Sequence, residues 1–248
     1  MTALDQPVIS VHFPKTSGTS FRIALQAALG DDNVIGSYDC DPLDPANPCW
    51  IHPAWFLRNC PRDIQPYRAL HGHIRIHKYD LLPAAYRITM LREPVENLIS
   101  IYFFWRSIFE INPKGHAIYE FVRERSLSLL ETAEIPGLRR LMSATYFGDF
   151  DMRRFDVIGI YDRRAAFFSS VSKLLGVTIA ADIEENVTPP SEERGNLVAD
   201  TRLMARLRDL LQDDIRFYEA HSGGGGRFRW AKPFFSKLAG PKPRAASQ

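Results

Sequence analysis

This sequence has few cysteines, almost no excess of either charge and no long apolar run. Lysine and arginine number 31 against 29 acidic residues, so the formal net charge is only +2. Such a weak overall field gives no case for a nucleic-acid partner or a membrane surface. Any site for an anion therefore has to be a local cluster of cations.

The three cysteines are Cys40, Cys49 and Cys60, and they show neither CxxC nor CxH spacing. An odd number of cysteines without such spacing argues against a disulfide scaffold and against a zinc site. We expect free thiols and no bound metal.

Signals for membrane insertion or export are also missing from the sequence. No apolar run approaches the roughly eighteen residues of a membrane span. The start, from Met1 to Asp5, lacks the basic and then apolar pattern of an export signal. We expect a soluble, cytoplasmic protein without a membrane span.

The composition predicts one main domain. Hydrophobic residues make up 45% of the 248 positions, which is enough for one substantial core. We expect this domain to cover residues 1–221, with residues 31–65 as an irregular, proline-rich insertion near a substrate cleft. Residues 222–248, which open with a run of glycines and become basic, are expected to form a flexible tail.

Apolar, β-branched segments alternate with helical patterns along the chain. Four strands are predicted, at Pro7–Phe13, Tyr67–His73, Arg87–Leu91 and Phe155–Tyr161. Helices are predicted from Pro94 onward and at Phe21–Leu29, Ala117–Arg125, Leu138–Ala144, Arg164–Leu175 and Thr201–His221. The alternation indicates an α/β fold with a mostly parallel central sheet and helices on both faces.

The first predicted strand leads into a short loop, PKTSGTS, before its helix. Unpaired N–H groups and the positive end of the dipole make such a helix start a place for an anion. It is not a Walker A loop, because the lysine precedes the glycine, and an ordinary helix cap has a similar composition. The candidate phosphate ligands are Lys15, Thr16, Ser17, Gly18, Thr19 and Ser20.

A second basic and hydroxyl pair follows the strand Arg87–Leu91. Arg92 ends this strand, and Ser100 lies eight residues later in the predicted helix. Both can face one pocket, where the arginine would bind a phosphate and the serine would add a donor. The alternative is a surface pair between Arg92 and Glu96 with a solvated serine.

Two histidines, His71 and His73, occupy alternate positions at the end of the second strand. Alternate strand positions lie on one face, so the pair could move protons or bind a metal. No clear third ligand accompanies them, which favours a general base over zinc. Ordinary packing is the remaining alternative.

These motifs, PKTSGTS, then HGH, then LREPVENLISIYFFW, resemble the sulfotransferases that use 3′-phosphoadenosine 5′-phosphosulfate (PAPS). The nearest likeness is to the glycan branch that includes the uronyl 2-O-sulfotransferases. It covers roughly residues 8–30 and 68–221. The resemblance implies a P-loop-NTPase-like sulfotransferase fold, PAPS as donor with PAP as product, no metal, and a hydroxyl-bearing acceptor, either a glycan or a small metabolite.

The resemblance also implies residue roles. The loop from Lys15 to Ser20 would hold the 5′-phosphosulfate, Arg92 and Ser100 would hold the 3′-phosphate, and Lys15 would also serve catalysis. His73 would be the base and His71 would support it or orient the acceptor, with the reverse assignment open. Arg194 falls where relatives close a basic loop over the nucleotide.

One residue departs from the family pattern. The family more often has glycine where this chain has Ser17, so we expect a negative or only mildly strained φ at this serine.

Two other functions remain open at this point. An ATP-dependent small-molecule kinase also joins strand to helix with a phosphate loop, but it needs side chains arranged for Mg²⁺. A binding module could hold a nucleotide or a glycan without transferring any group.

Overall fold

A computed structural model gives the arrangement of most of the chain. It describes residues 4–36, 43, 55, 58–59, 64, 66–80, 82, 84–107, 117–181 and 191–222. Most of the expected insertion at 31–65, and the expected tail beyond residue 222, lie outside the described residues.

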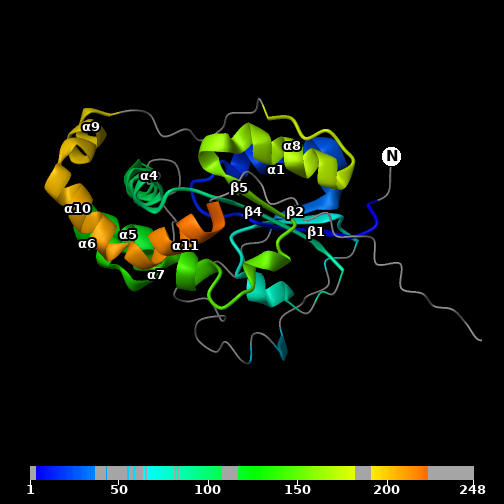
Figure 1. Cartoon of the computed structure of the whole chain (residues 1–248), viewed down its shortest axis with the longest axis horizontal. Helices are drawn as coiled ribbons and strands as arrows, with labels where there is room; N and C mark the ends of the chain where they lie inside the picture. Colours follow the sequence, from blue (N-terminus) through cyan, green and yellow to red (C-terminus); the bar gives the residue numbers. More distant parts are fainter. Residues whose placement is uncertain are drawn as a thin grey trace, which may run out of the picture.

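A parallel sheet forms the centre of the described residues (Figure 1). Its strands are β1 (Val8–Val11), β2 (Val34–Gly36), β3 (Ala69–Gly72), β4 (Tyr86–Leu91) and β5 (Val157–Ile160). They are ordered β2-β3-β1-β4-β5, and each neighbouring pair runs parallel. The predicted α/β class with a mostly parallel sheet is confirmed.

The sheet contains one strand that the sequence analysis did not predict. β2 is only three residues long and lies at the edge of the sheet, beside β3. It falls in the segment expected to be irregular, because a run this short shows no clear period-2 pattern.

Helices follow most of the strands. Their bounds are α1 Gly18–Leu29, α4 Pro94–Ser107, α5 Ala117–Glu124, α6 Leu129–Glu134, α7 Pro136–Arg139, α8 Arg164–Leu175, α9 Glu192–Ala199, α10 Thr201–Leu210 and α11 Gln212–Ser222. Shorter turns are η1 Asp31–Asn33, η2 Ile76–Tyr79, the π-helical η4 Leu141–Tyr146, η5 Met152–Arg154 and η6 Tyr161–Arg163.

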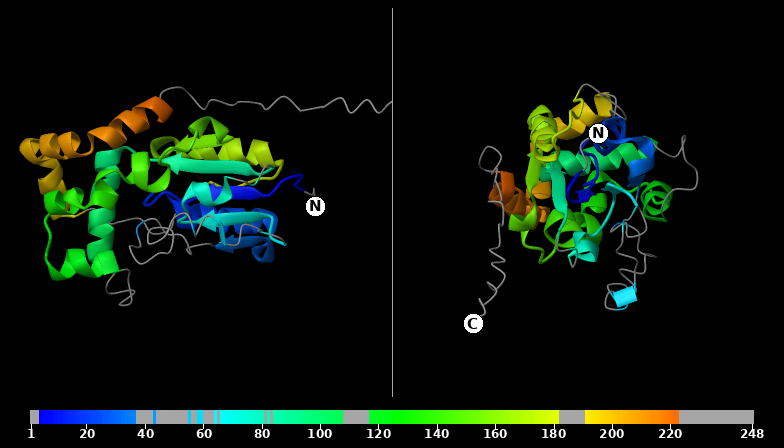
Figure 2. Two further views of the ribbon diagram at one scale, coloured as in Figure 1. Left: turned by 90° about the horizontal axis from the view of Figure 1, so that it is seen from below. Right: turned by 90° about the vertical axis from the view of Figure 1, so that its right-hand side faces the viewer.

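Two separate apolar clusters confirm that helices cover both faces of the sheet. Under α1 and α8, the cluster includes Phe21, Leu25 and Phe168 with the strand residue Ile88. The larger cluster joins the other face to α4–α7, α10 and α11. Figures 1 and 2 show α1 and α8 together against one face, with α4, α5, α6, α7 and α10 grouped beyond one end of the strands.

The helices differ from prediction in four places, one of which is the unpredicted α9. α6 was missed although its Ser128 and Glu131 form a capping box, a signal that the sequence does carry. The predicted helix Leu138–Ala144 is divided between α7 and η4. The predicted helix Thr201–His221 is interrupted at Leu211, between α10 and α11.

Candidate active site at the carboxyl ends of the strands

The register of the sheet brings three distant segments to one edge. Val11 lies opposite Gly72 of β3 and Thr89 of β4, so the residues that follow β1 and β3 are neighbours. The His12 N–H donates to the Gly72 carbonyl at 2.8 Å, which continues the β1–β3 ladder beyond the strands. The phosphate loop, the histidine pair and the start of α4 therefore meet at the carboxyl ends of parallel strands, the usual place for a site in such sheets.

The phosphate loop is fixed by hydrogen bonds within itself and to α4. The Thr16 hydroxyl donates to the Phe13 carbonyl at 2.6 Å, and the Asn97 amide donates to the Pro14 carbonyl at 2.7 Å. Ser17 is the N-cap of α1, yet its side chain makes no capping hydrogen bond. The start of α1 thus lacks the side-chain cap that would compete with a bound anion.

Of the two backbone conformations expected for Ser17, this serine has the strained one and not a negative φ. Its φ is +60°, in the left-handed region that favours glycine, and Lys15 has a φ of +57°. A non-glycine residue held there costs backbone energy that the surrounding contacts have to offset. The strain falls at the one loop position where this chain departs from the pattern that the motif resembles.

Gly18 is needed here because a histidine lies against it. A Cβ added at Gly18 would lie 1.8 Å from Nε2 of His12, far closer than two atoms can approach. The residue therefore lets an imidazole pack onto the start of α1, a reason that the sequence analysis did not give.

His12 lies between the two predicted histidines. Its ring stacks on His71 with centroids 5.0 Å apart and on His73 with centroids 4.2 Å apart. At one end, His71 Nδ1 lies 2.8 Å from the Ser10 hydroxyl, and at the other His73 Nδ1 lies 2.9 Å from the Tyr146 hydroxyl. The result is a continuous row of three imidazoles, with His73 as its half-buried end.

Burial keeps the inner imidazoles uncharged. Desolvation, and then the nearby His73, lower the pKa of His71 to about 3. The same two causes hold the pKa of the fully buried His12 well below its ordinary value. Neither ring therefore carries a charge at neutral pH.

Cations gather on the other side of the loop. Lys15 Nζ lies 3.9 Å above the centre of the Phe104 ring, and burial followed by the nearby Arg92 lowers the pKa of Lys15 to about 8. Arg92 donates to the Lys15 carbonyl at 3.2 Å and stacks on Tyr161 at 4.3 Å. Two cations held so close together, beside an uncapped helix start, fit a polyanion such as a nucleotide.

Arg194 joins this group from a distant helix. Its Nη2 lies 3.2 Å from Glu96 Oε2, and Arg92 Nη2 lies 4.0 Å from the same oxygen. The two guanidinium groups thus share one carboxylate oxygen. The Arg92–Glu96 pair that was considered as an alternative is present, but as part of a cluster of cations.

The expected basic loop around Arg194 is a helix. The segment forms α9, whose N-cap Ser191 accepts a hydrogen bond from the Arg194 N–H. Ion pairs of Glu193 with Arg106 and of Arg194 with Glu96 fasten α9 to α4. The remaining predicted ligand, Ser100, is buried two turns into α4.

Sequence reasoning missed His12 and Tyr146, and it named Glu96 only as the partner of Arg92 in a surface pair. His12 had a usable signal, since it follows β1 directly and parallel neighbours of that strand would place it beside His73. Tyr146 lies 73 residues after His73, and no local pattern connects the two.

Neither a metal centre nor a membrane helix can be recognised where the structure is described. In that part of the chain, no group of three or more His, Cys, Asp or Glu side chains is placed to bind a metal ion. No described helix combines the length and the apolar character that a bilayer span requires.

Comparisons with known proteins find distant likenesses only. No known family profile and no curated protein matches the chain. Among solved structures, it is similar to a sulfotransferase from Alicyclobacillus acidocaldarius, with 14% identity, a TM-score of 0.37, and coverage of 87% of this chain and 100% of that one. It is also similar to mouse sulfotransferase SULT7A1 complexed with PAP, with 11% identity, a TM-score of 0.35, and coverage of 90% and 91%. Because these similarities are so low, a function for this chain has to be argued from the arrangement of its own site residues.

Proposed function

We propose that this protein is a sulfotransferase that moves a sulfuryl group from PAPS to an acceptor hydroxyl. One observation carries the proposal: a short series of contacts joins the predicted donor site to the predicted base. Arg92 donates to the Lys15 carbonyl, the Lys15 loop starts the helix on which His12 packs, and His12 stacks on His73. The three motifs, scattered over the sequence, thus adjoin at one edge of the sheet.

The donor would lie along the cationic side of the site. Its 5′-phosphosulfate suits the uncapped start of α1 with Lys15, while its 3′-phosphate suits Arg92 and Arg194, with Ser100 as a further donor. The hydroxyl of Thr16 already donates its hydrogen to the Phe13 carbonyl. It therefore has none left for a phosphate oxygen and can only accept a hydrogen bond. The remaining loop ligands are Ser17, Gly18, Thr19 and Ser20.

His73 is the proposed base. In the tautomer in which Nδ1 donates to Tyr146, Nε2 carries the lone pair that takes the acceptor's proton. The acceptor oxygen then forms its bond to sulfur, the bond between sulfur and the bridging oxygen breaks, and PAP leaves with that bond's electron pair. The low pKa of His71 makes that residue a poor base at neutral pH, which supports its role as a partner of His73.

Lys15 is proposed to act on the leaving group. Negative charge grows on the bridging oxygen and the 5′-phosphate as the sulfuryl group departs, and a cation with the α1 dipole can stabilise it there. The charge of this lysine therefore contributes to turnover as well as to binding.

A carbohydrate or glycoconjugate is the proposed acceptor class. The support for it is the order and form of the motifs, which are most similar to the glycan branch of these enzymes. The cytoplasmic location remains a prediction from the sequence.

A pair of calorimetric titrations tests the donor assignment against the kinase alternative. The protein should bind PAP without a metal and should bind ATP with Mg²⁺ much more weakly. Transfer of labelled sulfate from PAPS to hydroxyl acceptors then separates an enzyme from a binding module. Preference for ATP with Mg²⁺ over PAP would contradict the proposal.

A further inference from the structure

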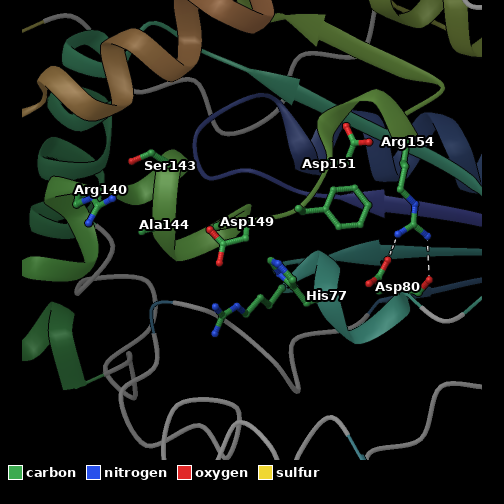
Figure 3. A pocket seen from close by; sticks show the side chains of 11 residues that line it. His77, Asp80, Arg140, Ser143, Ala144, Asp149, Asp151 and Arg154 are labelled. Atoms are coloured by element: carbon green, nitrogen blue, oxygen red, sulfur yellow. Dashed lines mark hydrogen bonds and ion pairs between the residues drawn. The ribbon is translucent and has the colours of Figure 1, made fainter.

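A pocket of about 550 Å³ lies outside the proposed donor site. One side is formed by Arg75 and His77 from the segment after β3, and the other by η4 and the residues that follow it (Figure 3). Its volume is in the range of about 300–1,000 Å³ that is usual for small-molecule sites.

Each side of this pocket belongs to a chain segment that also contains the proposed base, His73, or its hydrogen-bond partner, Tyr146. Tyr146, which contacts His73 Nδ1, belongs to the same η4 turn as the pocket residue Ser143. Arg75 and His77 follow His73 by two and four residues. Both walls of the pocket are therefore continuous in the chain with residues at the proposed base, which is the reason to connect the pocket with the acceptor.

The charges that line the pocket balance one another. Three arginines (Arg75, Arg140 and Arg154) stand against three aspartates (Asp80, Asp149 and Asp151). Much of this charge is already paired, since Arg154 contacts Asp80 and Arg140 Nε lies 3.2 Å from Asp213. A carboxylate brought in by a ligand would meet no surplus of cations and would face the exposed Asp149.

The pocket wall nevertheless offers both hydrogen-bond donors and acceptors. His77 Nδ1 is buried and has no hydrogen-bond partner among the described residues. Burial, and then Arg75, lower the pKa of His77, so its imidazole is neutral. Figure 3 shows Asp149 beside this ring, and Phe150 meets the ring edge-on with centroids 5.9 Å apart.

This mixture suits hydroxyl groups. A hydroxyl both donates and accepts, so it can donate to the carboxylate of Asp149 without bringing a charge, and it can bond the buried Nδ1 of His77 once that ring turns toward the pocket. A neutral ring with several hydroxyls meets these conditions, whereas a simple alcohol would leave most of the wall unused.

We infer that this pocket binds the acceptor, and that the bound part of the acceptor is an uncharged, hydroxyl-rich ring such as a neutral sugar. The inference rests on the proposed function and narrows its substrate class to acceptors without a carboxylate at this position.

The test uses neutral mono- and disaccharide glycosides of the gluco, galacto and manno series. Each is paired with the uronic acid in which one hydroxymethyl group is a carboxylate. Transfer of labelled sulfate from PAPS to each member is measured at equal concentration. We expect neutral sugars to be sulfated at least about ten times faster than their uronic acids.

The variant Asp149→Asn tests the role of the pocket itself. Removing this exposed charge should shift the ratio of neutral to uronic transfer toward the uronic acids by about tenfold while leaving the Kd for PAP unchanged. Asp209→Asn, the same change on an exposed part of α10, should leave the ratio as it is.

The outcomes separate the two proposals. A wild-type protein that does not bind PAP would contradict the donor assignment. A protein that binds PAP but prefers uronic acids, sulfates other hydroxyl acceptors but none of the sugars, or keeps its ratio in Asp149→Asn would overturn the pocket assignment alone.

Discussion

At the scale of single residues, the site consists of groups whose chemistry is changed by close neighbours. Ser17 and Lys15 take left-handed backbone conformations. Gly18 has no side chain, which leaves the space that the His12 ring fills. Lys15 and Arg92 are two cations placed together, which costs energy until an anion binds. These features favour a site built for a ligand over an ordinary helix cap.

Replacement of the proposed base should affect turnover and spare binding. We expect His73→Ala to lower kcat by about 100- to 10,000-fold with an unchanged Kd for PAP. His221→Ala, near the end of α11, is the control. Near-normal kcat in the His73 variant would move the proton transfer to another group.

Loss of the proposed 3′-phosphate ligand should weaken donor binding. Arg92→Ala removes a charged hydrogen-bond donor, so PAP binding should lose about 1.5–3 kcal/mol in calorimetric titrations. Arg208→Ala, an exposed arginine of α10, should have no effect. Equal affinities for the two variants would exclude Arg92 from the PAP site.

The charge of Lys15 should appear in the pH profile. Since its pKa is lowered to about 8, the charged form declines as the pH rises through that value, and kcat/KM for PAPS should fall above about pH 8. Lys15→Arg keeps its charge, so its descending limb should lie at higher pH. If the descending limb lies at the same pH in both proteins, the ionisation belongs to a group other than Lys15.

At the scale of elements, α4 is the part to which the rest of the donor site is attached. It receives the phosphate loop through Asn97, holds Arg194 through Glu96, and holds α9 through Arg106. The sequence predicted this helix and Arg92 just before it, because a strand followed by proline marks a helix start. It did not predict α9, whose Ser191 cap and ion pairs depend on where a distant segment lies.

One carboxylate oxygen of Glu96 contacts the guanidinium groups of both Arg92 and Arg194, which are proposed to bind phosphate. We expect Glu96→Gln to release both of them and to strengthen PAP binding by about two- to fivefold, the scale of an exposed ion pair. α9 should remain attached through Arg106 and Glu193. Glu124→Gln on α5 is the control, and weaker PAP binding in Glu96→Gln would show that this carboxylate orients the arginines instead.

At the scale of the whole molecule, the fold was largely predictable and the site only in part. Four of the strands and the helix α8 follow from apolar patterns that reflect burial on a parallel sheet. The contact between His73 and Tyr146 was not predictable, because the position of η4 is set by packing across the whole chain. Strand order alone would have placed His12 in the site.

Donor binding should stabilise the entire domain, since its ligands come from α1, α4 and α9. At 100 times its Kd, PAP should add about 2.7 kcal/mol to the free energy of unfolding, measured from denaturant midpoints. ATP at the same concentration should add far less. A midpoint that does not move with PAP would show that the nucleotide does not bind the folded chain.

The row of imidazoles has a consequence for the reaction cycle. Once His73 has taken a proton, the next two rings inward are too deeply buried to accept it, so the charge has no inward path. It has to leave from the side on which this half-buried ring is exposed. If the acceptor approaches from that side, departure of the sulfated product and regeneration of the base share one route, and a product slow to leave would also delay the recovery of the base.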